Sequence, residues 1–414
     1  MPGDYNNISL RENILRIFDL LILFCLTYTL LTAQCAPKIS YISLMILTVL
    51  FFIRLAHERN FETPEKIIIL FIASFLVVQF ISSLMSIDPR QSITVMKIRV
   101  FYYAVFFIAI LFIKTQKQAG AVLASIIIFT SILSLIEVCR FVFDLHTRNL
   151  SPTQMRIGYY IHPVTSAEIK MIVVFIILPL LLTKEKFIFS KKWLLAFLIP
   201  IFASFMFTYA RGAFIALFTG VMLIGALKNR KIIYITVIFL IVYFLVLPSS
   251  VNQRLASLKN PTDRSVMARE FMFETGVQIA KDNFLIGVGS INLKDTYEKY
   301  RIATIWAEGE QLHNNLLQLM VTTGIFGLLI WLAMMAYIFK RQIEIYRQTK
   351  SHEVLNAFAL TSLVSMVAFQ ICGLTDWNFA DYSVVSYLWM TVSLAFIAKK
   401  FMITSPLNSR QNGY

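Results

Sequence analysis

Two basic residues lie beside apolar stretches of this sequence, where one could bind an anion and the other could accept a proton. Arg211 lies between two apolar stretches, so its guanidinium and the N-terminal amides of the following helix could bind the same anion. His313 lies just before another apolar stretch, and an imidazole there can take up a proton near neutral pH. Each residue alone has a simpler interpretation, because an interfacial arginine can reach lipid headgroups and a histidine can cap a helix.

Further candidate residues lie in other segments of the chain. Lys97 and Arg99 lie inside an apolar stretch, where exposure to solvent explains them poorly. Arg264 and Arg269 lie in a segment with helical periodicity, and a solvated helix face is the simpler interpretation of both. The remaining candidates stand in loops or beside His313, and they are Arg156, His162, Asn314, Asp376 and Asp381.

The sequence gives no sign of a metal centre or a redox pair. Its four cysteines are scattered and form no CxxC or Cys/His spacing. Asp376 and Asp381 could hold a cation, but no cluster of carboxylates with convincing metal spacing accompanies them. Arginine side chains can neutralise the charge that Mg²⁺ neutralises in other enzymes. We therefore expect no metal ion and no cofactor.

The elements that position these residues must be membrane helices. Of the 414 residues, 58% are hydrophobic and 15% are charged, and the mean hydropathy is +0.71. This composition excludes an ordinary soluble domain, a disordered chain and a disulfide scaffold. Because roughly 20 apolar residues cross a bilayer core, the sequence predicts an all-α polytopic integral membrane protein with about 12 transmembrane helices. The predicted spans are 14–33, 39–56, 66–85, 95–113, 119–139, 165–183, 193–209, 211–227, 231–247, 314–339, 354–373 and 382–401.

The distribution of charge predicts which way these spans face. The formal net charge is +15, and compact basic clusters stand in loops that an even number of spans places on the same side as both termini. Lysine and arginine accumulate in cytoplasmic loops, so we expect cytoplasmic termini and no nucleic acid as a partner. We interpret the first apolar stretch as a membrane helix rather than a cleaved signal sequence. The basic clusters lie at 184–192, 228–231, 340–350 and 399–400.

The predicted spans divide the chain into three parts. Residues 1–247 hold the first nine spans, residues 248–313 form one large external loop, and residues 314–414 hold the last three spans and a cytoplasmic tail. Within the loop, residues 265–281 repeat apolar side chains at helical spacing, and residues 293–306 do so more weakly. A glycine-containing turn at 287–290 separates them. We expect short amphipathic helices that lie on the outer membrane surface and cover a site there.

The external basic residues favour an anionic ligand. Arginine and lysine at the outer surface run against the topology rule, so something anionic should compensate them. A lipid-linked pyrophosphate is such a ligand, because a guanidinium binds phosphate oxygens through two parallel hydrogen bonds.

Four short motifs together resemble the O-antigen ligase family and its polymerase relatives. His313-Asn314 opens a span and Gly324-x-x-Gly327 follows, which is similar to the end of the large periplasmic loop in that family. The other three motifs follow the family order, and they are Arg211-Gly212-Ala213, Ala268-Arg269-Glu270 and Gly373-Leu374-Thr375-Asp376. The topological resemblance covers most of the chain, whereas the motifs cover only its second half.

The resemblance implies a membrane glycosyltransferase of the GT-C type. Such a ligase transfers a completed polysaccharide from undecaprenyl pyrophosphate to a sugar hydroxyl of lipid A-core, at the periplasmic face of the bacterial inner membrane. It needs neither a nucleotide sugar nor a divalent metal, and in-line attack would invert the anomeric centre. By the same resemblance, Arg211 and Arg269 bind the pyrophosphate, and His313 is the base or positions the acceptor. The further substrate-binding candidates are Lys97, Arg99, Arg156, Arg264, His162, Asn314 and Asp376.

The implied partners are the lipid-linked donor, the lipid A-core acceptor and membrane lipids, with the protein acting as a monomer. An O-antigen polymerase remains an alternative, since it uses the same donor with a second lipid-linked sugar as acceptor. A protein O-oligosaccharyltransferase is another, although those often carry an extra soluble domain. A lipid flippase or anion transporter would place its site near the bilayer midplane, whereas the basic residues here cluster near the outer interface.

Overall fold

The computed structural model describes residues 3–57, 65–151, 154–246, 264–289, 293–300 and 311–404. Within these ranges the chain forms helices and connecting loops and contains no strand. The helices of the first half are α1 (Gly3–Thr32), α2 (Pro37–Ala56), α3 (Lys66–Leu84), α4 (Pro89–Val100), α5 (Ala104–Phe112), α6 (Gln116–Thr147) and α7 (Pro163–Leu181). Those of the second half are α8 (Lys191–Met206), α9 (Arg211–Leu227), α10 (Lys231–Val246), α12 (Arg264–Asp282), α13 (Lys294–Tyr300), α14 (Asn315–Gln348), α15 (Glu353–Cys372) and α16 (Tyr382–Thr404).

Every predicted span coincides with a helix, which confirms an all-α polytopic membrane protein. In the part of the chain that the structure describes, nine helices are long and apolar enough to cross a membrane, with α4 and α5 joined through a short 3-10 turn as one of them. The other three predicted spans are α8, α9 and α10, which have 16, 17 and 16 residues. They are shorter than the roughly 20 residues that a bilayer core usually takes.

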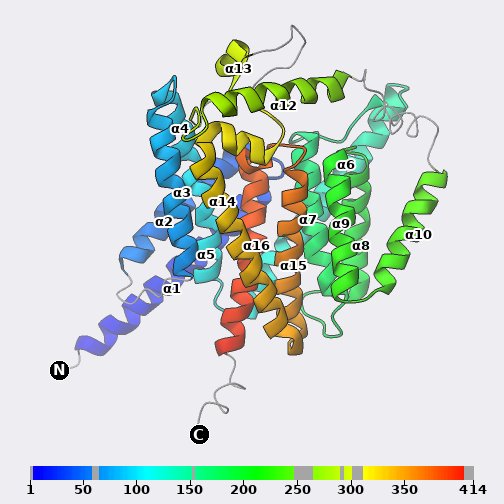
Figure 1. Ribbon diagram of the computed structural model, residues 1–414. Coiled ribbons are helices and arrows are strands. Elements are labelled where there is room, and N and C mark those ends of the chain that lie inside the picture. Colours follow the sequence, from blue (N-terminus) through cyan, green and yellow to red (C-terminus); the bar gives the residue numbers. More distant parts are fainter. Residues whose placement is uncertain are drawn as a thin grey trace.

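The helices form one bundle whose centre is made by α7, α15 and α16 (Figure 1). α15 packs on α16, α9, α7 and α14, so its side chains are almost entirely enclosed. Large apolar side chains on the outer faces are exposed, among them Phe24 of α1, Phe52 of α2 and Ile199 of α8. An apolar exterior is what a helix bundle in lipid requires. The start of α1 and the end of α16 lie at one end of the bundle, and α12 and α13 lie at the other (Figure 1).

The predicted amphipathic helix at 265–281 is present as α12, which lies across the end of the bundle (Figure 1). Its apolar side contains Met272 and Ile279, which form a separate small core with Leu312 and Val321. The second predicted helix, at 293–306, is described only as the seven-residue α13, and residues 301–306 lie outside the described part of the chain.

A break in α14 receives the turn that follows α12. Gly324 has φ 64° and ψ −170°, which interrupts the helix, and the carbonyls of Val321 and Thr322 lose their helical partners. The amides of Val288 and Gly289 donate to these two carbonyls at 2.8 and 3.0 Å. The predicted turn at 287–290 therefore supplies the hydrogen-bond donors that are missing where α14 is interrupted. The structure describes this turn as far as Gly289. Because it is hydrogen-bonded into α14, it also fixes the position of α12.

Candidate active site

His313 and Asp376 form the centre of a polar cluster at the α12 end of the bundle. His313 Nδ1 lies 2.9 Å from Asp376 Oδ1, and the two side chains are 30% and 23% exposed. Because a carboxylate only accepts hydrogen bonds, Nδ1 is the donor, and Nε2 of the neutral ring is left as the acceptor. A partly exposed imidazole held in this tautomer is suited to accept a proton from a hydroxyl group.

The backbone around His313 is held in a conformation that favours this arrangement. His313 has φ 48°, in the left-handed region that a side chain other than glycine seldom adopts. Asn314 fixes the chain immediately afterwards, since its Oδ1 accepts from the Leu317 amide at 2.9 Å and its Nδ2 donates to the Leu374 carbonyl at 3.0 Å. The sequence analysis offered Asn314 as a substrate-binding residue, and the structure shows it as the N-cap of α14.

Arg211 is the first residue of α9 and lies in the same neighbourhood. A Cβ placed on Gly212 would be 2.3 Å from Thr375 Oγ1, so the first turn of α9 packs directly on the residue before Asp376. Arg211 is partly buried and has no ion-pair partner among the described carboxylates. Its charge therefore stays available beside the start of a helix, where anions bind favourably.

Arg156 and His162 belong to the loop before α7, which pairs with the turn before α9. Arg156 Nε donates to the Thr208 carbonyl at 2.8 Å, and the Ile157 amide donates to the Phe207 carbonyl at 2.9 Å. Arg156 is exposed and close in structure to the turn that leads to Arg211. His162 is the N-cap of α7, where its side chain accepts a 3.4 Å hydrogen bond from the Val164 amide.

Arg99 reaches the same loop from α4. Its guanidinium carbon lies 5.6 Å from the centre of the Trp377 ring, and Trp377 is the residue that follows Asp376. Lys97, two residues earlier on α4, is exposed. The structure thus brings Arg99 to the site loop and leaves the side chain of Lys97 exposed.

Arg269 and Arg264 stand on α12. Arg269 is exposed and has no ion-pair partner among the described residues. The side chain of Arg264 lies outside the described part of the chain. α12 therefore carries Arg269 over the end of the bundle.

Asp381 acts as a helix cap in this structure. Its Oδ1 accepts from the amides of Ser383 and Val384 at the start of α16, and its Oδ2 accepts from Thr165 Oγ1. Burial raises the pKa of the Asp381 carboxyl, although these three donors oppose the shift. The described residues include no group of three His, Cys, Asp or Glu side chains with a geometry that could hold a metal ion.

The sequence analysis missed the buried carboxylates of α6 and α7. Glu168 lies beneath the site and accepts a 2.9 Å hydrogen bond from Asn378 Nδ2. Glu137 forms an ion pair with Lys170 at 2.7 Å, and both side chains are at most 4% exposed. A carboxylate inside an apolar stretch was the available signal, because its burial is costly in a membrane.

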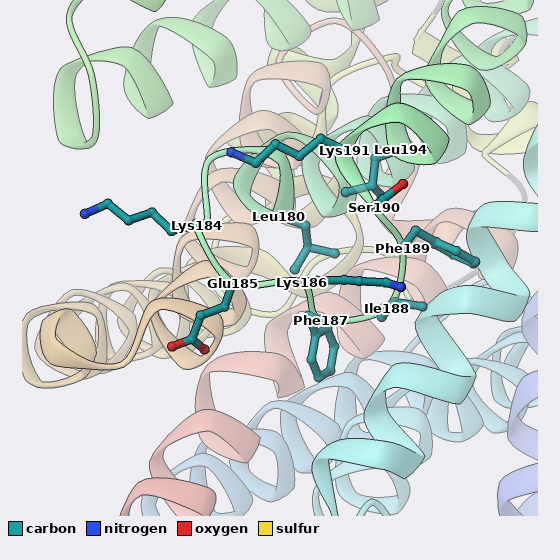
Figure 2. A pocket seen from close by; sticks show the side chains of 10 residues that line it. All are labelled: Leu180, Lys184, Glu185, Lys186, Phe187, Ile188, Phe189, Ser190, Lys191 and Leu194. Atoms are coloured by element: carbon teal, nitrogen blue, oxygen red, sulfur yellow. The ribbon is translucent and has the colours of Figure 1, made fainter.

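A hollow of about 240 Å³ opens at the other end of α7, in the loop to α8 (Figure 2). Lys184 and Lys191 point to one side of this loop and Lys186 points to the other, so the three ammonium groups do not converge (Figure 2). Because α7 spans the bundle, this hollow is separate from the cluster around His313.

Residues 193–332 match the family model described as O-antigen ligase. These residues, which we call the O-antigen ligase segment, are about a third of the chain and are similar to that family. This result confirms the resemblance to the O-antigen ligase family. The O-antigen ligase segment contains Arg211, Arg269 and His313, and it ends before Asp376. None of the curated proteins compared with the chain matches it.

Proposed function

We propose that this protein is an O-antigen ligase of the GT-C type. It transfers polysaccharide from undecaprenyl pyrophosphate to a sugar hydroxyl of lipid A-core, and it works as a monomer without a cofactor. The O-antigen ligase segment supports a glycosyltransferase-like activity of the ligase and polymerase class. The observation that carries the proposal further is the His313–Asp376 pair at 2.9 Å, packed beside the first turn of α9 that bears Arg211.

In this proposal the two sides of the reaction use different residues. His313 Nε2 takes the proton of the acceptor hydroxyl as its oxygen attacks the anomeric carbon, and Asp376 stabilises the resulting imidazolium. Arg211 binds the pyrophosphate that leaves, with Arg269 contributing from α12. Pyrophosphate is a good leaving group once its charge is stabilised, so no general acid is required. In-line attack inverts the anomeric centre.

The proposed orientation places the site in the periplasm and both termini in the cytoplasm of a bacterium, in the inner membrane. The basic loops 184–192 and 228–231, the start of α1 and the end of α16 lie at one end of the bundle, whereas α12 and the start of α14, next to His313, lie at the other (Figure 1). Positive charge favours the cytoplasmic side, which supports this orientation.

A reconstituted transfer assay tests the proposal. Purified protein is mixed with undecaprenyl-pyrophosphate-linked glycan and lipid A-core, in EDTA and without nucleotide. The variants are Arg211→Ala and His313→Ala, with Arg148→Ala and His146→Ala as matched controls, since these two exposed residues lie at the same end of the bundle.

We expect a glycan ladder on lipid A-core that both site variants lose and both controls keep. Longer lipid-linked chains without a ladder would identify an O-antigen polymerase instead. If neither product forms, the proposal of glycosyl transfer is wrong and the transporter alternative gains support.

A further inference from the structure

Glu168 is a buried carboxylate without a basic partner among the described residues. It lies on α7 with 1% of its surface exposed, and the charged groups that act on it, Asp376 and Asp381, are also acidic. A charge in this environment is costly unless hydrogen bonds compensate it. Its hydrogen-bond partner is Asn378, whose Nδ2 donates to Glu168 Oε2 at 2.9 Å.

Glu168 and the Phe369 carbonyl together fix the direction of a short chain of hydrogen bonds. Asn378 Nδ2 faces two acceptors, Glu168 Oε2 and the Phe369 carbonyl at 3.1 Å, so the amide has one favourable orientation. Its Oδ1 then accepts from Asn315 Nδ2 at 2.7 Å. Because the Phe369 carbonyl only accepts, Asn378 Nδ2 is the donor, and the bonds run from Asn315 through Asn378 to Glu168.

This chain lies directly behind the His313–Asp376 pair. Asn315 comes two residues after His313, and Asn378 comes two residues after Asp376. Both hydrogen-bonded pairs are therefore separated by 63 residues and connect the same two segments of the chain. The Asn315 amide also donates to the Gly373 carbonyl at 2.6 Å. The position of the Asn315–Asn378 pair therefore determines how His313 faces Asp376.

We propose that Glu168 is a positioning residue for the His313–Asp376 pair. It orients Asn378, which orients Asn315, and these two hold the start of α14 against the loop before α16. This inference rests on the proposed function, since His313 is taken there as the base. Glu168 itself is enclosed by protein and does not touch substrate.

An exchange of hydrogen-bonding groups tests the inference. Asn378→Asp removes the amide that donates to Glu168 and to the Phe369 carbonyl, so we expect kcat to fall about a hundredfold through misplacement of the base. KM for the lipid-linked donor should not change, because Arg211 is untouched. In Glu168→Gln/Asn378→Asp, the new amide donates to the new carboxylate, so at least a tenfold recovery of kcat is expected relative to Asn378→Asp.

Two further variants cover the case in which Asn378→Asp fails to fold. Glu168→Gln keeps a side-chain acceptor for Asn378 and should retain most activity, whereas Glu168→Ala leaves Asn378 only the Phe369 carbonyl and should lose most of the activity. Glu137→Gln is the matched control, because Glu137 is also 1% exposed, lies on the neighbouring α6 and bonds to Lys170 and Ser204 instead. It should lower the melting temperature without changing kcat per folded molecule.

The outcomes separate this inference from the proposed function. Absence of transfer by the wild-type protein would refute the proposed function. Transfer by the wild type, with no recovery in the double variant and full activity in Glu168→Ala, would refute the role of Glu168 alone. A pH profile of kcat completes the comparison, since a misplaced base changes the profile and simple loss of folded protein does not.

Discussion

Gly287 and Gly324 lie in direct backbone contact, although 37 residues separate them along the chain. A Cβ on Gly287 would come within 2.6 Å of the Gly324 amide nitrogen, and a Cβ on Gly324 would come within 2.3 Å of the Leu285 carbonyl oxygen. Both residues have positive φ, 75° and 64°. Only glycine allows this approach, because any larger residue would meet backbone atoms that cannot move aside.

This contact connects the two elements that bring candidate residues to the site. α12 carries Arg269, and α14 begins two residues after His313. The Ile325 amide donates to the Phe284 carbonyl at 2.8 Å, and Ser82 Oγ donates to the Thr322 carbonyl at 2.6 Å, so α3 takes part as well. The Gly-x-x-Gly motif that resembles the ligase family is thus, in this structure, the place where a membrane helix breaks.

Replacing Gly324 by alanine should destabilise the protein. The conformation at φ 64° and ψ −170° is nearly restricted to glycine, so the strain costs about 1–3 kcal/mol before the clash with Leu285 is counted. Gly287→Ala should have a similar effect. Thermal unfolding of the protein in detergent, followed by circular dichroism, measures both.

Gly120→Ala is the control for these glycine variants. Gly120 lies in α6, and a Cβ there would make an ordinary 3.4 Å contact with Phe187. We expect a gain of about 0.5–1 kcal/mol, since alanine is the better helix former. Equal melting temperatures for Gly324→Ala and the wild type would contradict the argument from backbone contact.

Replacing Asp376 by asparagine should reduce transfer while leaving the fold intact. An amide can donate to His313 Nδ1 and so favour the tautomer in which Nε2 cannot accept a proton. We expect kcat to fall by about 10²–10⁴. Asp381→Asn serves as control, because asparagine also caps helices and Asp381, which caps α16 and accepts from Thr165, does not contact His313. Similar losses in both variants would argue against a specific role of Asp376.

Replacing Arg211 by lysine separates charge from geometry. Lysine keeps the positive charge but cannot bind a phosphate group through two parallel hydrogen bonds. We expect Arg211→Lys to raise KM for the lipid-linked donor and to lie between the wild type and Arg211→Ala in kcat/KM. Steady-state kinetics at several donor concentrations measures this order. Equal values for lysine and alanine would show that the guanidinium geometry is indispensable, and wild-type values for both would remove Arg211 from the site.

The sequence predicted the positions of the helices better than their lengths. Hydropathy marks the part of a helix that lies in lipid, and the helix itself continues into water. α14 therefore runs to Gln348 instead of 339, and α6 runs to Thr147 instead of 139. The basic residues at 340–341, assigned to a loop, continue α14, and Arg341 pairs with Glu65 at 2.9 Å.

The candidate site was predictable in part. Arg211, His313 and Asp376 were singled out as ionisable residues at the ends of apolar stretches, and the structure places them in one neighbourhood. The link between Glu168 and Asn378 spans 210 residues, so no spacing along the chain could reveal it. The role of Gly324 was hidden for a similar reason, since the break needs the distant turn at Gly287.

Replacing one residue of the buried ion pair between α6 and α7 should destabilise the protein strongly. Glu137 and Lys170 lie 2.7 Å apart, and Ser204 Oγ donates to the Glu137 carboxylate at 2.8 Å. Glu137→Leu or Lys170→Met alone leaves one buried charge unpaired and should cost about 3–5 kcal/mol. The double variant should lie close to the wild type, because two apolar side chains need no partner. A double-mutant cycle of unfolding free energies measures the coupling, and additive losses would contradict it.

The stability of the protein should fall in acid through Glu65. Burial alone would raise the pKa of this carboxyl, but the hydrogen bonds and charges of Arg341 and Lys399 outweigh it and hold the pKa below the usual range. A lowered pKa means that the folded state binds the proton less tightly than the unfolded chain does. The stabilisation is therefore complete above the usual carboxyl pKa and is lost as the pH falls through the lowered value.

Glu65→Gln isolates this contribution. At neutral pH the variant should be less stable by about 1–3 kcal/mol, because the ion pairs with Arg341 and Lys399, at 2.9 and 3.2 Å, are gone. As the pH falls through the acid range, the melting temperatures of the wild type and the variant should converge, since the wild-type carboxylate becomes protonated. Melting curves at several pH values test this. A constant difference between the two proteins across the whole range would show that the Glu65 charge does not stabilise the fold.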